Sequence, residues 1–336
     1  PAAGQGQLSV ARITMPELPE VERARRVLER FCVGFVVKCC QVVQDNKVFE
    51  GVAPDTFKER MTGATILAAR RKGKHLWLEL KERPWPLIHL GMTGSFAAVS
   101  PDGTKEVAEY VNSRVDAESW PPKFWKFRLV MENGNDVAFI AIRRFERVRM
   151  QQDPRRESPV KDLGFDPLTD MLPLADFKDE LLSRSGPVKG ALLDQSFCAG
   201  VGNWIADEVL YQARLHPQTP SSSLSLEQVE AVWQSLQMVI GKACEEEADS
   251  SKFPKDWLFH YRWNKKQASK TLEGHNISFL TVAGRTTAWV PALQKKTTTA
   301  GQQVVGKRIK KGGEENNPVK KEEGEEEEEE REDQDI

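Results

Sequence analysis

Residues 198–210 read CAGVGNWIADEVL. Gly200 and Gly202 permit a tight turn, and a helical pattern follows over residues 204–215. The backbone amides at a helix N-terminus attract anions, so we expect this turn and Asn203 to form an anion site suited to a phosphate. A G-x-G before a helix is weak evidence by itself, so the interpretation depends on the rest of the chain.

The sequence on either side of this turn predicts more helices. Amphipathic patterns cover residues 174–182 and 188–193, and Ser225 with Gln228 forms a capping box that opens a long helix. We therefore expect residues 151–255 to form a helical domain.

Residues 16–150 follow a different pattern. After one amphipathic helix near residues 21–31, short alternating runs such as residues 75–80 predict strands. Polar residues 100–122 interrupt these runs and predict a long loop. The fold class that follows is α+β, with an N-terminal antiparallel β-sandwich and flanking helices.

Composition narrows the class of protein. Residues 313–336 hold thirteen acidic and three basic residues, whereas the remainder holds 45 basic and 37 acidic ones. A basic body favours a nucleic-acid partner, although ordinary solvated surface explains charge runs equally well. The longest apolar runs, such as residues 138–142, are too short to span a bilayer, so we expect no membrane partner. Five cysteines without a C-x-x-C pair argue against a four-cysteine zinc site and favour a reducing compartment.

Residues 15–21, MPELPEV, carry the chemistry. If translation starts at Met15 and that residue is removed, Pro16 becomes an N-terminal secondary amine, which can attack an aldehydic sugar carbon. Glu17 and Glu20 would then donate and accept protons beside it. The alternative is an ordinary helix start, in which proline and acidic residues favour the N-terminus. We expect residues 1–15 to be a leader that the mature enzyme lacks.

These strings, with the elements below, resemble the formamidopyrimidine-DNA glycosylase family, in particular its plant-type branch. The resemblance extends from Met15 to about residue 296, and the PELPE string separates the chain from the endonuclease VIII branch. It implies a helix–two-turn–helix DNA-binding domain in residues 151–255 and a bifunctional DNA glycosylase/AP lyase. In this mechanism Pro16 attacks the sugar, Glu17 assists departure of the base, and Glu20 shapes the site.

The resemblance also assigns residues that contact DNA. Lys74 and His89 match phosphate contacts, and Met92 matches an apolar wedge that fills the gap left by an extruded nucleotide. Without this resemblance, a lysine at a strand start is usually solvated, and a methionine in a turn usually packs on the core.

Three further matches complete the expected DNA contacts. Arg143 and Phe145 correspond to residues that contact the orphaned base, and Arg285 corresponds to a phosphate-binding arginine. Around the first pair, the chain has Ile142 and Glu146 where the family usually has proline and glycine.

Residues 256–296 resemble a zinc finger that lacks its zinc ligands. The positions of the four family cysteines hold Lys270, Glu273, Val290 and Leu293, which do not suit Zn²⁺. We therefore expect a zincless β-hairpin finger from residues 276–282 and 286–290, with no metal and no cofactor. Residues 245–256 are too few for the lid that covers 8-oxoguanine in bacterial members, which predicts weaker use of that base.

The complete prediction divides the chain at residues 1–15, 16–150, 151–255, 256–296 and 297–336, the last being a disordered basic and then acidic tail. We expect a monomeric enzyme acting on damaged double-stranded DNA, with repair proteins contacting the acidic tail. The alternative is a non-catalytic damaged-DNA-binding protein, because an internal Pro16 has no free amine. Residues 307–311, KRIKK, favour the nucleus, and a targeting role of the leader would favour an organelle.

Overall fold

The structure, a computed structural model, describes residues 15–108, 119–263 and 269–296. All of them belong to one compact unit, Pro1–Thr299. The expected leader before Met15, the 307–311 basic cluster and the acidic tail lie outside the described residues. No helix among the described residues is long and apolar enough to cross a membrane.

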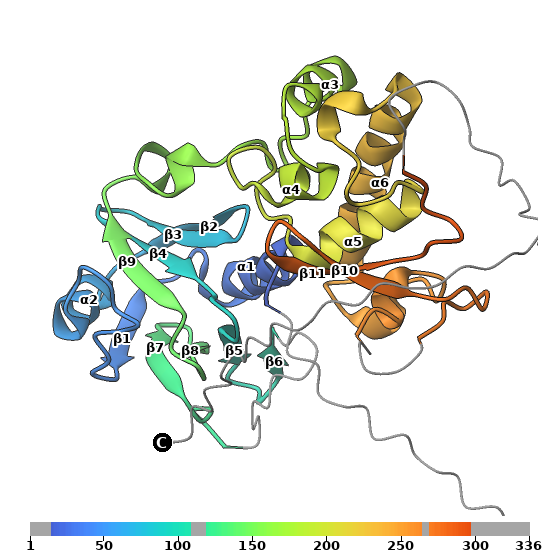
Figure 1. Cartoon of the computed structure of the whole chain (residues 1–336). Coiled ribbons are helices and arrows are strands. Elements are labelled where there is room, and N and C mark those ends of the chain that lie inside the picture. Colours follow the sequence, from blue (N-terminus) through green and yellow to red (C-terminus); the bar gives the residue numbers. More distant parts are fainter. Residues whose placement is uncertain (1–14, 109–118, 264–268, 297–336) are drawn as a thin grey trace, which may run out of the picture. The chain divides into compact units, whose positions relative to one another are not determined.

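The N-terminal part is a sandwich of two antiparallel sheets, which confirms the predicted fold class (Figure 1). The larger sheet has the order β1-β7-β8-β5-β6 and the smaller one β2-β3-β4-β9. The strands are β1 (Val37–Val42), β2 (Ile66–Lys72), β3 (His75–Leu80), β4 (Trp85–His89), β5 (Ser95–Val99), β6 (Lys105–Val107), β7 (Trp125–Met131), β8 (Asp136–Ile140) and β9 (Arg147–Gln151).

Aromatic side chains fill the sandwich. Phe127 contacts the rings of Phe57, Phe96 and Phe139 at centroid distances of 5.1 to 6.1 Å. Phe57 comes from helix α2 (Pro54–Met61), which the sequence analysis did not predict. The expectation of one long loop over residues 100–122 is wrong, because residues 105–107 form β6, which pairs with β5. This strand is only three residues long, too short for alternation to reveal it.

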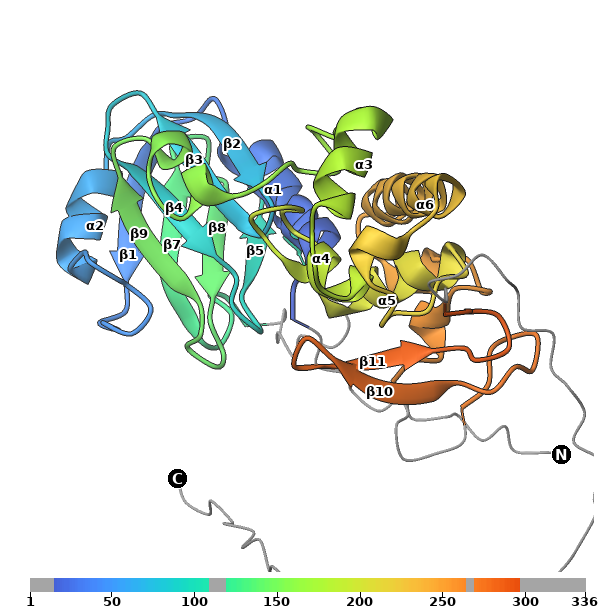
Figure 2. The same cartoon turned by 45° about the horizontal axis from the view of Figure 1, so that its top comes forward.

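Helix α1 (Leu18–Cys32) belongs to both halves of the protein. Val21, Ala24 and Leu28 join the sandwich core, whereas Leu18 joins the core of the helical part. The helix accordingly lies between the sandwich and α5 in both views (Figures 1 and 2). Its N-terminal residues are therefore placed where the two cores meet.

The helical part follows the predicted pattern closely. Helices α3 (Leu174–Leu182) and α4 (Val188–Leu193) have the predicted bounds, and α5 (Asn203–Gln212) ends three residues before the predicted end. Ser225 caps α6 (Leu226–Glu245) through the predicted capping box. Short 3-10 turns complete this part: η1 (Pro154–Arg156), η2 (Val160–Asp162), η3 (Ser221–Ser223), η4 (Ser250–Lys252) and η5 (Leu258–His260).

Strands β10 (Ser278–Val282) and β11 (Arg285–Trp289) form the hairpin, which lies along α5 (Figure 2). Two of the four positions at which the resemblance expects zinc cysteines belong to a small apolar cluster: Val290 is fully buried and Leu293 packs against it. Lys270 and Glu273, at the other two positions, are exposed. The described residues contain no group of three or more His, Cys, Asp or Glu side chains that could hold a metal ion.

Candidate active site

A cleft of about 770 Å³ brings together residues from both halves of the protein and from the hairpin. Five residues predicted from the sequence line it: Glu17, Lys74, His89, Asn203 and Arg285. Pro16 is buried between two lining residues, Met15 and Glu17. The cleft is therefore the candidate active site, and the chain enters α1 at its wall.

Glu17 occupies the N-terminus of α5. Its carboxylate accepts hydrogen bonds from the backbone amides of Gly202 (2.9 Å), Trp204 (2.8 Å) and Ile205 (3.1 Å). These amides have no acceptor within the helix, and the helix dipole favours an anion at this end. The expectation that this turn offers its amides to a DNA phosphate is therefore wrong for these three groups, because a carboxylate from residue 17 already binds them.

Glu20 lies one turn further along α1 and accepts a hydrogen bond from the backbone amide of Glu17 at 3.0 Å. Burial, with the neighbouring charge of Glu17, raises the pKa of Glu20 to about 8. Burial also raises the pKa of Glu17, against the opposing effects of Lys74 and of the α5 amides. Both carboxyl groups therefore hold a proton more firmly than an exposed glutamate, and Glu20, with a pKa of about 8, can supply an acid in neutral solution.

Lys74 reaches the same wall from the β2–β3 turn. Gly73, at φ +57°, allows this turn to approach the helical part so closely that a Cβ atom would lie 3.0 Å from Ala199 Cβ. The Lys74 ammonium donates to the carbonyl of Val201 at 3.1 Å. Burial lowers the pKa of Lys74, while the charges of Glu17 and Glu20 oppose this shift. Lys74 thus places a cation beside the two carboxyl groups.

Asn203 connects α5 to the hairpin. Its amide nitrogen donates to the Thr286 carbonyl at 2.8 Å, and its oxygen accepts from the ammonium of Lys189 at 2.6 Å. Lys189 is fully buried and forms an ion pair with Asp207, with 2.6 Å between Nζ and Oδ1. The sequence analysis missed Lys189, although a lysine within the otherwise apolar stretch of α4 was a usable signal.

Asp207 also binds the β10–β11 hairpin. Its Oδ2 atom accepts from the Arg262 guanidinium at 2.6 Å and from the backbone amide of Ala288 at 3.0 Å. The hairpin turn at Ala283 and Gly284, both with positive φ, then presents Arg285 at the cleft with its side chain exposed. Charged groups on α4 and α5 thereby set the position of the hairpin arginine.

The remaining predicted residues lie on two loops that are bonded to each other. Glu146 is fully buried and accepts from the backbone amide of Thr93 (3.2 Å) and from its hydroxyl (2.8 Å). The backbone amide of Arg143 donates to the same hydroxyl at 3.2 Å. These bonds join the loop that carries Met92 to the loop that carries Arg143 and Phe145.

The second loop presents its side chains to the surface. Phe145 is 50% exposed, and the guanidinium of Arg143 lies 5.2 Å from its ring centroid. Between them, Arg144 adopts φ 59° and is held by Asp45, which accepts from its guanidinium at 2.8 and 2.9 Å. The glutamate that departs from the expected pattern therefore bonds the two loops together through its Oε1 atom, whereas its buried Oε2 atom has no hydrogen-bond partner among the described residues.

Comparison with known proteins identifies the family. A model of the formamidopyrimidine-DNA glycosylase N-terminal domain matches residues 15–148, and a model of the formamidopyrimidine-DNA glycosylase H2TH domain matches residues 163–255. A formamidopyrimidine-DNA glycosylase of Arabidopsis thaliana is 46% identical over 282 residues, which cover 84% of this chain and 71% of the relative.

The chain belongs to the formamidopyrimidine-DNA glycosylase family.

Solved structures of formamidopyrimidine-DNA glycosylases agree with this assignment. The Lactococcus lactis enzyme bound non-covalently to DNA containing an AP site has a TM-score of 0.67 and 25% identity, and the match covers 83% of this chain and 100% of that one. A variant of the same enzyme with Fapy-dG containing DNA matches with the same score and identity over 84% and 100%. The protein is accordingly a DNA glycosylase of base excision repair, with DNA as its partner.

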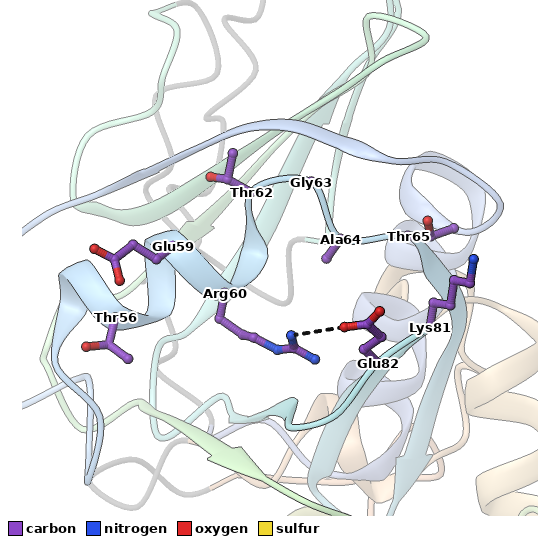
Figure 3. A pocket seen from close by; sticks show the side chains of 9 residues that line it. All are labelled: Thr56, Glu59, Arg60, Thr62, Gly63, Ala64, Thr65, Lys81 and Glu82. Atoms are coloured by element: carbon purple, nitrogen blue, oxygen red, sulfur yellow. Dashed lines mark ion pairs between the residues drawn. The ribbon is translucent and has the colours of Figure 1, made fainter.

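A second hollow, of about 520 Å³, lies at the end of α2 and contains none of the residues expected in a formamidopyrimidine-DNA glycosylase site (Figure 3). Arg60 and Glu82 face each other there at 3.8 Å, and both are accessible to solvent. A solvent-accessible ion pair of this kind contributes little free energy, so this hollow is not a candidate active site.

Proposed function

We propose that the protein removes oxidised purines from double-stranded DNA and then cleaves the strand by β,δ-elimination, with the nitrogen of Pro16 as nucleophile. The observation that carries the proposal is the position of Pro16, which is buried between Met15 and Glu17, two residues that line a cleft with Lys74 and Arg285. These neighbours suit attack by a secondary amine on a DNA sugar. Glu17 can donate a proton, and the cations Lys74 and Arg285 can hold a phosphodiester.

The chemical steps can be written with their protons. The free nitrogen of Pro16 bonds to C1′ while the bond from C1′ to the base breaks, and the base takes up the proton that the proline nitrogen loses. Glu17 protonates O4′, the C1′–O4′ bond breaks, and the nitrogen becomes a positively charged iminium. Loss of a C2′ proton then expels the 3′ phosphate, loss of the C4′ proton expels the 5′ phosphate, and water hydrolyses the iminium to release the sugar remnant and the free amine of Pro16.

Burial raises the pKa of Glu17, which supports its part as a proton donor. Lys74, His89, Asn203 and Arg285 would grip the backbone around the extruded nucleotide. Met92, Arg143 and Phe145 would fill the space that it leaves in the duplex.

Formamidopyrimidines, hydantoin-type products and abasic sites are the proposed substrates, with weaker activity on 8-oxoguanine. The support is the short path between α6 and Trp257, which holds only two short turns and η4. We further propose a nuclear protein, on the basis of residues 307–311. Removing residues 297–336 from a fluorescent fusion should then abolish nuclear accumulation, and unchanged localisation would reject this part.

Borohydride trapping on abasic-site DNA tests the nucleophile. Protein that begins at Pro16 should form a covalent adduct, whereas protein that retains the unprocessed residues 1–15 should form none, because its Pro16 nitrogen is an amide. Intact mass spectrometry verifies the first residue of each form. An adduct from the unprocessed form would refute the assignment to Pro16.

A second candidate function is a non-catalytic damaged-DNA-binding protein. It rests on the peptide bond between Met15 and Pro16, which makes the Pro16 nitrogen an amide that cannot act as a nucleophile. The same experiment separates the two. Tight binding to damaged duplex without an adduct from either form would favour the binding protein.

A further inference from the structure

Trp263 lines the candidate active site, although its position was not singled out from the sequence. The residue follows η5 and shares the cleft with Glu17, Lys74 and Arg285. Two tryptophans line this cleft, and they differ in exposure. Trp204 is only 1% exposed and packs against Phe253 and Phe259, whereas Trp263 is half-buried.

Several contacts fix the orientation of the Trp263 indole. Its Nε1 group donates to the carbonyl of Phe259, and the Phe259 ring meets the indole edge-on at a centroid distance of 5.4 Å. The guanidinium of Arg262 lies 4.5 Å from the indole centroid and is itself held by Asp207 at 2.6 Å. Because the single polar group of the indole is already bonded to the protein, the ring has only its aromatic surface to offer to a ligand.

The other side chains of the cleft suit the sugar-phosphate part of a nucleotide. Lys74 and Arg285 are cations, and Asn203 and Glu17 are polar. A planar aromatic surface beside them matches the remaining part of a nucleotide, which is the base. Enzymes that extrude a base commonly hold it by stacking on an aromatic side chain, and a cation against the indole stiffens such a platform.

We propose that Trp263 is the residue on which the extruded damaged base stacks, and that it sets the preference for planar, purine-derived bases. This inference rests on the proposed function, since it requires a nucleotide extruded into the cleft. Trp263 acts on the base alone: it helps to hold the base before excision, and an abasic site, which has no base, does not need it.

The test compares two reactions of the same protein, beginning at Pro16. Excision is measured in single turnover on duplex containing a formamidopyrimidine, and strand cleavage is measured on duplex with a preformed abasic site. Loss of one aromatic stacking partner corresponds to a fall of about 5- to 150-fold. We expect Trp263→Leu to slow excision within this range, Trp263→Phe to slow it less, and both to change abasic-site cleavage by less than about twofold.

Trp233→Leu is the matched control. Trp233 lies on α6, is also half-buried, and donates through Nε1 to a main-chain carbonyl, that of Leu172, but it does not line the cleft. This variant should leave the ratio of the two rates unchanged. Unaltered excision by Trp263→Leu would overturn the proposal.

An equal loss of both activities in Trp263→Leu and Trp263→Phe would also overturn it, since that result indicates a purely structural role. If the wild-type protein cleaves no abasic site, the proposed function itself has failed. This outcome is distinct from a wild-type enzyme whose Trp263 variants are unaffected.

Discussion

The buried ion pairs of Asp207 allow a quantitative prediction. Asp207→Ala removes the anion shared by Lys189 and Arg262 and the acceptor of the Ala288 amide. Both cations are at least nine-tenths buried, so neither can replace the lost carboxylate with bulk water. Breaking a buried pair in this way costs about 3–5 kcal/mol, a large share of the roughly 5–15 kcal/mol that stabilises a typical domain.

Urea unfolding at neutral pH measures this cost, as a fall in the midpoint at unchanged slope. Asp207→Asn keeps an acceptor for the Ala288 amide and should lose less stability than Asp207→Ala. Glu82→Ala is the control, because its partner Arg60 lies 3.8 Å away at the surface, and it should cost less than about 1 kcal/mol. Equal losses in Asp207→Ala and Glu82→Ala would refute the assignment of the Asp207 cluster as the attachment of the hairpin to α5.

Three further predictions follow from other parts of the site. The pKa of Glu20 is raised in the folded state to about 8, so its contribution to stability is fully present below pH 4.5 and is lost as pH rises through 8. Glu20→Gln should therefore flatten the fall in unfolding free energy between pH 5 and 9, and a parallel pH profile for both proteins would contradict this. Glu146→Ala removes the two hydrogen bonds to Thr93 that join the loops proposed to open the duplex. Cleavage of an abasic site in duplex DNA should therefore fall, whereas cleavage in single-stranded DNA should not. An equal fall on both substrates would exclude a role of these loops in opening the duplex. Treatment with EDTA should leave base excision and unfolding free energy unchanged, and a loss that added zinc reverses would show that the finger does bind metal.

The sequence alone determined the elements whose cause is local. Helices α3 and α4 follow from apolar spacing, and the start of α6 follows from the hydrogen bonds between Ser225 and Gln228, three residues apart. The β10–β11 hairpin was also predictable, because Ala283 and Gly284 separate two runs of strand-forming residues. Strand β6 escaped prediction because three residues carry too little pattern.

The candidate site was only partly predictable. The family resemblance indicated Glu17, Lys74 and Asn203 as members of one site, and the structure brings these three together in the cleft. The hydrogen-bond partners could not be inferred: the backbone amides of Gly202, Trp204 and Ile205 bind the Glu17 carboxylate, and the side-chain amide of Asn203 binds the hairpin. Each of these contacts joins residues more than eighty positions apart.

Such contacts depend on how α1, α5 and the hairpin pack against one another. Hydrophobic spacing specifies which face of each element is buried, but not which polar groups meet at the end of that face. The pairing of Glu17 with α5, of Lys189 with Asp207 and of Thr93 with Glu146 was therefore decided only in the tertiary structure, where each buried charge or amide needs a partner that its own segment does not supply.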